Sequence, residues 1–262
     1  MKKDLNIENI ISILEKENYK YHNLQFPYGM VSSIYDKIIK ELLDTFFNYE
    51  VCGLEIYDNI RQPPISSKIY LKEKGNLVEN GYKLEFNLLY PFIIIKLWEN
   101  SDINFNINEF GVLYSFLVNN YKNVKKLNIS KDIIILWKTL INYTFSILIN
   151  PVSQFIRCDY ISFVTSYMNN FYDDLIKRYN GIILCVDTDT IYLDFMTKEF
   201  IEDIKKIDIP FDISNLDFFL MDKKKIIEFN NGNIKSIGLK KYKSNYQLEK
   251  DRIKKLKKIK SI

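Results

Sequence analysis

Histidine and cysteine, on which many enzyme sites depend, are scarce in this chain. His22 is the single histidine among 262 residues, so zinc hydrolases, Ser-His-Asp triads and Cys-His nucleophile pairs have little support. The three cysteines, Cys52, Cys158 and Cys185, are scattered and odd in number. They show no metal-ligand spacing and disfavour a disulfide framework, which favours a reducing, intracellular compartment.

Long apolar runs are also missing. The longest apolar stretch, residues 133–149, is interrupted by Lys138 and Asn142, and the basic N-terminal segment lacks an apolar core of signal-peptide length. We therefore expect neither a transmembrane span nor a membrane partner. Hydrophobic residues nevertheless make up 47% of the chain and aromatic residues 15%, which predicts a folded protein with a substantial core.

A strong net charge of either sign is absent as well. The chain has 37 Lys and Arg residues against 33 Asp and Glu residues, a formal net charge of +4. This balance permits a polyanionic partner without demonstrating one. The basic residues gather near the end of the sequence, in residues 249–262 (EKDRIKKLKKIKSI), and a basic amphipathic helix is expected over residues 246–259.

Periodicity and turn signals predict a mixture of helices and strands. Helices are expected at 5–16, 33–48, 108–121, 131–149, 159–178 and 197–206, where apolar residues recur every three or four positions. Extended segments are expected at 67–73, 81–89, 182–193, 224–229 and 234–239. The dipeptides Gly75-Asn76, Asn180-Gly181 and Asn231-Gly232 are typical of turns. This order favours the α+β class, with a few antiparallel strands carrying helices.

Two acids lie between β-prone apolar runs in the segment 182–193 (IILCVDTDTIYL). If both belong to one strand, Asp187 and Asp189 point to the same face, roughly 6.5–7 Å apart along the strand. The apolar flanks favour burial, whereas the acids require water, a cation or a partner. Because Mg²⁺ prefers one or two carboxylates together with substrate phosphates, the hairpin is a candidate Mg²⁺ site for phosphate chemistry.

A third acid, Glu85, interrupts an apolar strand that turns at Tyr90-Pro91 into a helix. A carboxylate from a neighbouring strand would complete a two-metal site with ions about 3.5–4 Å apart. The alternative is that Glu85 belongs to the solvated face of an edge strand. Spacing alone favours this alternative.

Two further pairs of residues suit phosphate binding. Lys138 and Asn142 are four residues apart on one helix face, where they can hold a triphosphate, although a Lys and an Asn on a helix exterior are the commoner case. Lys240 and Tyr242 are two apart on an extended segment and can grip a nucleic-acid backbone. This second pattern is weak by itself.

Taken in this order, four segments resemble the motifs of family B DNA polymerases. Residues 85–94 (EFNLLYPFII) are similar to motif A, usually Asp-Phe-x-Ser-Leu-Tyr-Pro-Ser-Ile-Ile, and residues 138–146 (KTLINYTFS) to motif B, usually Lys-x-x-x-Asn-Ser-x-Tyr-Gly. Residues 185–193 (CVDTDTIYL) are similar to motif C, usually Tyr-Gly-Asp-Thr-Asp-Ser, and residues 238–242 (GLKKY) to the Lys-x-Tyr element that follows. The resemblance covers residues 75–245 and is to the viral or linear-plasmid, protein-primed type, in a shortened and divergent form.

This resemblance implies a polymerase-like palm, which is an antiparallel sheet backed by helices, with a short two-helix fingers insertion and a reduced thumb. Residues 75–98 and 150–245 would form the palm, 99–149 the fingers and 246–262 a basic thumb-like helix, after an N-terminal helical and extended region, 1–74. The implied activity is DNA-directed transfer of nucleotides from dNTPs to a primer 3′-hydroxyl. The implied partners are primer–template DNA, dNTPs and other replication proteins, at a cytoplasmic or viral replication site.

The resemblance also implies the cofactors and the roles of the site residues. Two Mg²⁺ ions, for which Mn²⁺ can substitute, would be held by Glu85 and Asp189, with Asp187 closer to the second shell. The nucleotide would be bound by Tyr90 under the sugar and by Lys138 and Asn142 at the triphosphate. The primer terminus would be held by Lys240 and Tyr242.

Several positions depart from the family's usual motifs. Glu85 stands where motif A has Asp, Phe92 where it has Ser, and Tyr143 and Ser146 replace the Ser and Gly of motif B. These departures favour a second hypothesis, a catalytically weak or inactive homologue that serves as a DNA-binding or scaffold subunit. Two further hypotheses stay open: a metal-dependent glycosyltransferase, which also uses Asp-x-Asp, and a structural α+β protein.

Overall fold

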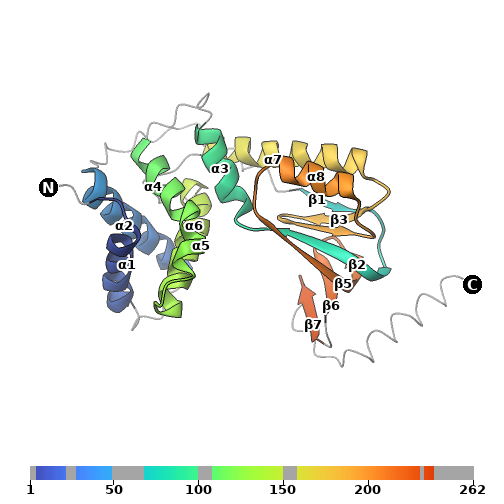
Figure 1. Ribbon diagram of the computed structural model, residues 1–262, viewed down its shortest axis with the longest axis horizontal. Coiled ribbons are helices and arrows are strands. Elements are labelled where there is room, and N and C mark those ends of the chain that lie inside the picture. The colour runs from blue at the N-terminus through green and yellow to red at the C-terminus, as the bar shows by residue number, and fades with distance from the viewer. Residues whose placement is uncertain are drawn as a thin grey trace, which may run out of the picture. The chain divides into compact units, whose positions relative to one another are not determined.

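The structure, a computed structural model, describes residues 4–21, 28–48, 68–99, 108–149, 158–230 and 233–238. The helices in these ranges are α1 (Ile7–Tyr21), α2 (Tyr28–Phe47), α3 (Leu89–Glu99), α4 (Asn108–Asn119), α5 (Tyr121–Val124), α6 (Lys131–Ile149), α7 (Cys158–Arg178) and α8 (Lys198–Lys206). The strands are β1 (Ile69–Leu71), β2 (Asn76–Phe86), β3 (Ile183–Asp187), β4 (Thr190–Leu193), β5 (Phe211–Asp222), β6 (Lys225–Asn230) and β7 (Asn233–Ile237) (Figure 1). The α+β class expected from the sequence is confirmed.

Two compact units make up the chain. The first comprises Met1–Ile65 and Tyr90–Thr165, and the second comprises Ser66–Leu89 and Ser166–Ile262. We call them the helical unit and the sheet unit. The finer division into palm, fingers and thumb stays a prediction. Across the described ranges, no helix is both long and apolar enough to cross a membrane.

The helical unit is organised around α6. Its buried stripe includes Trp137, Leu140 and Ile141, none of which has measurable exposure, and the Trp137 indole N–H donates a hydrogen bond to the Leu117 carbonyl, 2.9 Å away. The helix begins after Ser130, whose hydroxyl oxygen accepts from the Asp132 N–H at 3.1 Å. This cap and the apolar periodicity explain why the expected helix 131–149 agrees with α6.

The sheet unit contains one antiparallel sheet of seven strands, in the order β1-β3-β4-β2-β5-β6-β7. Its longest strand, β5, has 12 residues and was not expected from the sequence. Polar residues at 212, 214, 215 and 217 hide the alternation that usually marks a strand. The turn predicted at Gly75-Asn76 is present, because Gly75 has a positive φ of 72° and β2 begins at Asn76.

The two faces of the sheet have different coverings. The Phe86 ring of β2 meets the Phe171 ring of α7 edge to face, with centroids 6.5 Å apart. The Phe200 ring of α8 packs against Tyr179, the residue that follows α7, and both helices lie over the sheet (Figure 1). Since successive side chains on a strand point to opposite faces, Glu85 lies on the other face. We call the side of Phe86 the helix face and the side of Glu85 the acidic face.

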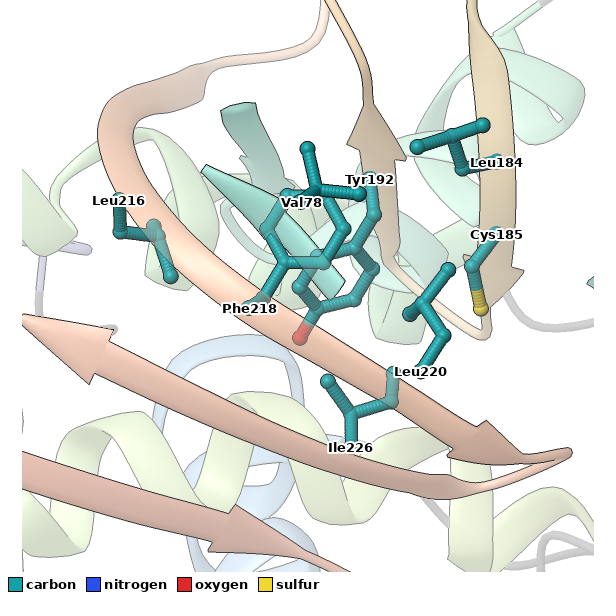
Figure 2. Close-up of a cluster of buried hydrophobic side chains, with 8 residues drawn as sticks. All are labelled: Val78, Leu184, Cys185, Tyr192, Leu216, Phe218, Leu220 and Ile226. Atoms are coloured by element: carbon teal, nitrogen blue, oxygen red, sulfur yellow. The ribbon is translucent and has the colours of Figure 1, made fainter. Parts of the chain in front are cut away.

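An apolar cluster fills one end of the acidic face (Figure 2). Its buried members are Val78, Leu184, Cys185, Tyr192, Leu216, Phe218, Leu220 and Ile226. The rings of Tyr192 and Phe218 lie 5.1 Å apart between centroids. Burial raises the pKa of the Cys185 thiol to about 12, with a smaller contribution from the charge of Asp187, so Cys185 is a core residue and not a nucleophile.

A bulge in β2 sets the register of this sheet. The pairing of β2 with β5 shifts between Val78 and Gly81. A Cβ atom at Gly81 would lie 2.5 Å from a ring carbon of Phe218, 2.8 Å from a methyl of Val78 and 2.9 Å from the carbonyl oxygen of Leu193. The glycine is therefore required by close approach of its neighbours.

We predict that Gly81→Ala destabilises the protein by about 1–3 kcal/mol, because the added methyl group overpacks the strand junction. Urea unfolding of the variant and the wild type measures the difference. Gly181→Ala is the matched control, since a Cβ atom there meets no atom within 4 Å and should change the stability by less than about 0.5 kcal/mol. Equal stability of the two variants would contradict the packing account.

Candidate functional site

The two acids of the hairpin 182–193 lie at a tight turn. Strand β3 ends at Asp187, β4 begins at Thr190, and these two residues are paired. Thr188 and Asp189 thus form a two-residue turn, and the expectation that Asp187 and Asp189 point to the same face of one strand is wrong. The physical reason is that such hairpin turns need a positive φ, which Thr188 adopts at 58°.

The backbone of this turn is held by neighbouring elements. The Tyr172 hydroxyl of α7 donates to the Thr188 carbonyl at 2.8 Å, and the Phe86 N–H of β2 donates to the Asp189 carbonyl at 2.9 Å. A positive φ is uncommon for a β-branched residue and persists where its surroundings impose it. The contacts therefore fix Asp189 beside the end of β2.

The strand register brings the acids of separate segments into one row. Asp187 of β3 pairs with Thr190 of β4, Thr190 pairs with Glu85 of β2, and Glu85 pairs with Asp212 of β5. Directly opposed residues share a face of the sheet, so all four lie on the acidic face. Glu85 and Asp187 are two strand spacings apart, about 10 Å between Cα atoms, and Asp189 lies in the turn that joins β3 to β4.

The carboxyl group of Asp189 has a raised pKa. Burial raises its pKa above the ordinary 3.8, and the charges of Glu85 and Asp187 raise it further, against hydrogen bonds from Thr190 and the local backbone. The Thr190 hydroxyl donates to Asp189 at 3.2 Å. The three carboxylates predicted from motifs A and C therefore lie within electrostatic reach of one another, and a bound cation would relieve their repulsion.

A buried lysine, which sequence reasoning did not single out, contacts this group. Lys83 Nζ lies 2.7 Å from Glu85 Oε2 and 3.1 Å from Glu228 Oε1. Burial by itself lowers the pKa of Lys83, but the hydrogen bonds and charges of Glu85 and Glu228 outweigh it and raise the pKa above 10.5. The spacing of Lys83 and Glu85, two residues apart on a strand, was the available signal that they share a face.

Asp212 is a second residue of the acidic face that sequence reasoning did not find. Asp212 belongs to β5, a strand that the sequence did not predict. The amide nitrogen of Asn87 donates to Asp212 Oδ2 at 2.7 Å, so the residue after β2 is tied to the start of β5. Asp212 thereby adds a carboxylate directly beside Glu85.

The donor set suits a hard divalent cation, although it does not form a closed cage. Among the described residues, no three Asp, Glu, His or Cys side chains converge as a ready-made metal centre, and Glu85 pairs with Lys83 instead. Mg²⁺ commonly binds one or two carboxylates and completes its shell with water and substrate phosphates. In this open mode, Glu85 and Asp189 would be the ligands, since a cation would relieve the like-charge interactions of Asp189 with Glu85 and Asp187.

The residues expected to bind the nucleotide belong to the helical unit. Lys138 and Asn142 are both exposed on α6, one turn apart. Tyr90 is half-buried in the first turn of α3. Burial raises the pKa of Tyr121, and the charge of Lys138 acts against this shift.

The residues expected to hold the primer, Lys240 and Tyr242, lie outside the described residues. The same is true of the predicted turn at Asn231-Gly232 and of the predicted basic helix 246–259. These three interpretations stay predictions.

Comparisons with known proteins bear on the fold of the chain. No family model matches the chain, and no match to a curated protein was found. Among solved structures, the chain is similar to a family B DNA polymerase, which comes from the hyperthermophilic archaeon Pyrobaculum calidifontis. The TM-score is 0.50 with 13% sequence identity, over 74% of this chain and 34% of that one. The chain spans about a third of the length of this polymerase, and the similarity concerns the fold.

We predict that Asp189→Asn makes the protein more stable at pH 7. Between pH 3.8 and its raised folded-state pKa, Asp189 holds a proton in the folded state that the unfolded state has lost, so its ionisation removes stability as pH rises through this interval. An amide avoids this ionisation. Urea midpoints should be higher for the variant at pH 7, and this gain should disappear below pH 3.8.

The control is Asp194→Asn, which changes an exposed acid just after β4. Its effect on the urea midpoint should be small at both pH values. A loss of stability in Asp189→Asn at pH 7 would contradict the electrostatic account of the turn.

Proposed function

We propose that this protein is a DNA polymerase-like nucleotidyltransferase, which transfers nucleotides from dNTPs to a primer 3′-hydroxyl under the direction of a template. The observation that carries the proposal is the placement of Glu85 and Asp187 on one face of an antiparallel sheet, with Asp189 in the adjoining turn, where the charges of both act on it. Support also comes from four motifs in the order of the family and from the fold similarity to a family B DNA polymerase.

The proposed chemistry uses two divalent cations held by Glu85 and Asp189, with Asp187 acting as a weaker or outer ligand. When bound, the Mg²⁺ or Mn²⁺ ions would favour deprotonation of the 3′-hydroxyl and neutralise charge on the triphosphate. The carboxylates hold the ions on the acidic face. Phosphoryl transfer needs positioning and charge stabilisation more than covalent help from the protein, and neither histidine nor a reactive cysteine is required.

Other residues are proposed to bind the nucleotide and the DNA. In the proposal, Lys138 and Asn142 bind the triphosphate, Tyr90 lies under the sugar, and Lys240 and Tyr242 hold the primer terminus. Residues 75–98 and 150–245 act as the palm, 99–149 as the fingers and 246–262 as the thumb, after the N-terminal region 1–74. Primer–template DNA is the partner.

A second candidate function is favoured by the ion pair of Glu85. Its carboxylate contacts Lys83 at 2.7 Å, and no three acids in the described part of the chain enclose a metal position. A site whose acids are engaged in this way suits a catalytically weak homologue that binds DNA as a scaffold subunit. The two candidates differ in whether extension of a primer depends on Asp189.

We predict that the purified protein extends a labelled primer on a template with Mg²⁺ or Mn²⁺ and dNTPs, and that Asp189→Ala lowers the rate by roughly 100-fold or more, the scale on which misplaced catalytic groups act. Gel-based extension assays measure the rate, and fluorescence anisotropy measures binding of the primer–template. Asp194→Ala, at an exposed acid just after β4, should extend like the wild type.

Two results of this experiment would redirect the proposal. Extension that survives in Asp189→Ala refutes the assignment of the active site. DNA binding without extension in either metal, in both the wild type and Glu85→Asp, favours the scaffold subunit.

We also predict that Lys138→Ala raises the KM for dNTPs more than it lowers kcat, because an exposed lysine that contacts the triphosphate contributes mainly uniform binding. Steady-state extension at varied dNTP concentration separates the two constants. Lys131→Ala, an exposed lysine in the first turn of the same helix, is the control and should leave both constants unchanged. Identical kinetics in the two variants would remove Lys138 from the nucleotide site.

A further inference from the structure

Lys83 is an unusual residue for its position, because lysine is rarely buried without a partner. It points from the middle of β2 onto the acidic face, where its side chain is only 9% exposed. Its ammonium lies between the carboxylates of Glu85 and Glu228, at 2.7 and 3.1 Å. Taking a lysine out of water is unfavourable unless its charge is compensated, so this double pairing is what allows the burial.

The deeper partner of Lys83 is rigidly held. Glu228 of β6 is 6% exposed, and the Tyr192 hydroxyl of β4 donates to its Oε1 at 2.6 Å. Lys235 of β7 lies 3.9 Å from its other oxygen. Tyr192 in turn packs in the apolar cluster of the acidic face (Figure 2). Strands β2, β4, β6 and β7 therefore meet at Glu228, and the position of Lys83 is set by the core.

The outer partner, Glu85, is different. Its side chain is 50% exposed, and a glutamate has one more rotatable bond than an aspartate, so in isolation it would sample several rotamers. The contact with Lys83 uses Oε2. A carboxylate offers about four lone-pair sites on two oxygens, so one ammonium contact restricts Glu85 without using up its capacity to bind a cation.

We infer that Lys83 is a positioning residue, whose ammonium, anchored on Glu228, holds the carboxylate of Glu85 on the acidic face for a divalent cation that it binds together with Asp189. The inference rests on the proposed function for the presence of the cation. It assigns to Glu228 and Tyr192 the role of fixing the lysine. Lys83 acts through Glu85 and does not itself contact the cation.

The test measures binding of Mn²⁺ alone to the full chain, by electron paramagnetic resonance of the free ion. Removal of Lys83 by itself would leave the buried Glu228 with only the Tyr192 hydroxyl and the more distant Lys235 as partners, which is destabilising. Lys83→Met is therefore made together with Glu228→Gln, and Glu228→Gln by itself is the reference. We expect the double variant to bind Mn²⁺ about 10-fold or more weakly than this reference, the usual effect of losing a group that orients a metal ligand.

Three further variants separate positioning from a general structural role. Lys83→Arg keeps the positive charge of the side chain and should therefore keep most of the affinity for Mn²⁺. In a Glu85→Gln background, the change at Lys83 should have no further effect, because the residue through which it acts is absent. Lys74→Met removes a surface ion pair of similar length, 2.8 Å to Asp222, and should leave Mn²⁺ affinity unchanged.

The outcomes distinguish this inference from the proposed polymerase activity. Loss of Mn²⁺ affinity in the Lys83 variants of a protein that extends no primer supports the inference and removes the activity. If the wild type extends primers but its Mn²⁺ affinity does not depend on Lys83, the polymerase activity is supported and the inference about Lys83 is refuted. Tighter Mn²⁺ binding after removal of Lys83 overturns the inference, because the ammonium would then compete with the metal ion. The inference is also overturned if the wild type does not bind Mn²⁺.

Discussion

The pairing register of β2 between β4 and β5 is the constraint on which the rest of the sheet unit depends. It sets Glu85 opposite Thr190 on one side and opposite Asp212 on the other. A slip of one residue would turn Glu85 towards α7 and place Phe86 on the acidic face. The bulge that ends at Gly81 allows the first part of β2 to keep Val78 in the apolar cluster while Glu85 stays with the acids.

Along the acidic face, the side chains change from buried and apolar at one end to exposed and charged at the other. At one end, apolar side chains around Phe218 are buried, and in the middle Lys83 and Glu228 are buried as a pair. At the other end, Glu85 is exposed and Asp189 carries a raised pKa. A left-handed threonine at position 188 and mutually repelling acids both lie at this end. Such strain is tolerated where the surrounding structure holds it, and it is typical of functional sites.

Local features of the fold were predictable because they depend on neighbours in the sequence. The helix 131–149 was expected with its capping residue, Ser130, since the apolar period and the cap are both written in consecutive residues. The hairpin 182–193 was expected for the same reason. Strand β5 was not predicted because its polar positions interact with partners more than a hundred residues away in the sequence. One example is Asp217, whose carboxylate accepts a hydrogen bond from the Asn80 N–H. The resemblance to family B DNA polymerases is supported at the level of the fold.

By itself, the sequence determined the fold class and the helices and hairpins with a clear period, and it marked Glu85, Asp187 and Asp189 as candidate site residues. Only the tertiary structure decided that Asp189 lies in a turn, that Asp212 joins the row, and that Lys83 is buried against Glu85 and Glu228. The physical reason is that strand pairing, burial and charge interactions couple residues that are remote in the chain. Periodicity reports the environment of a segment, whereas the partner of a buried charge depends on which strands meet.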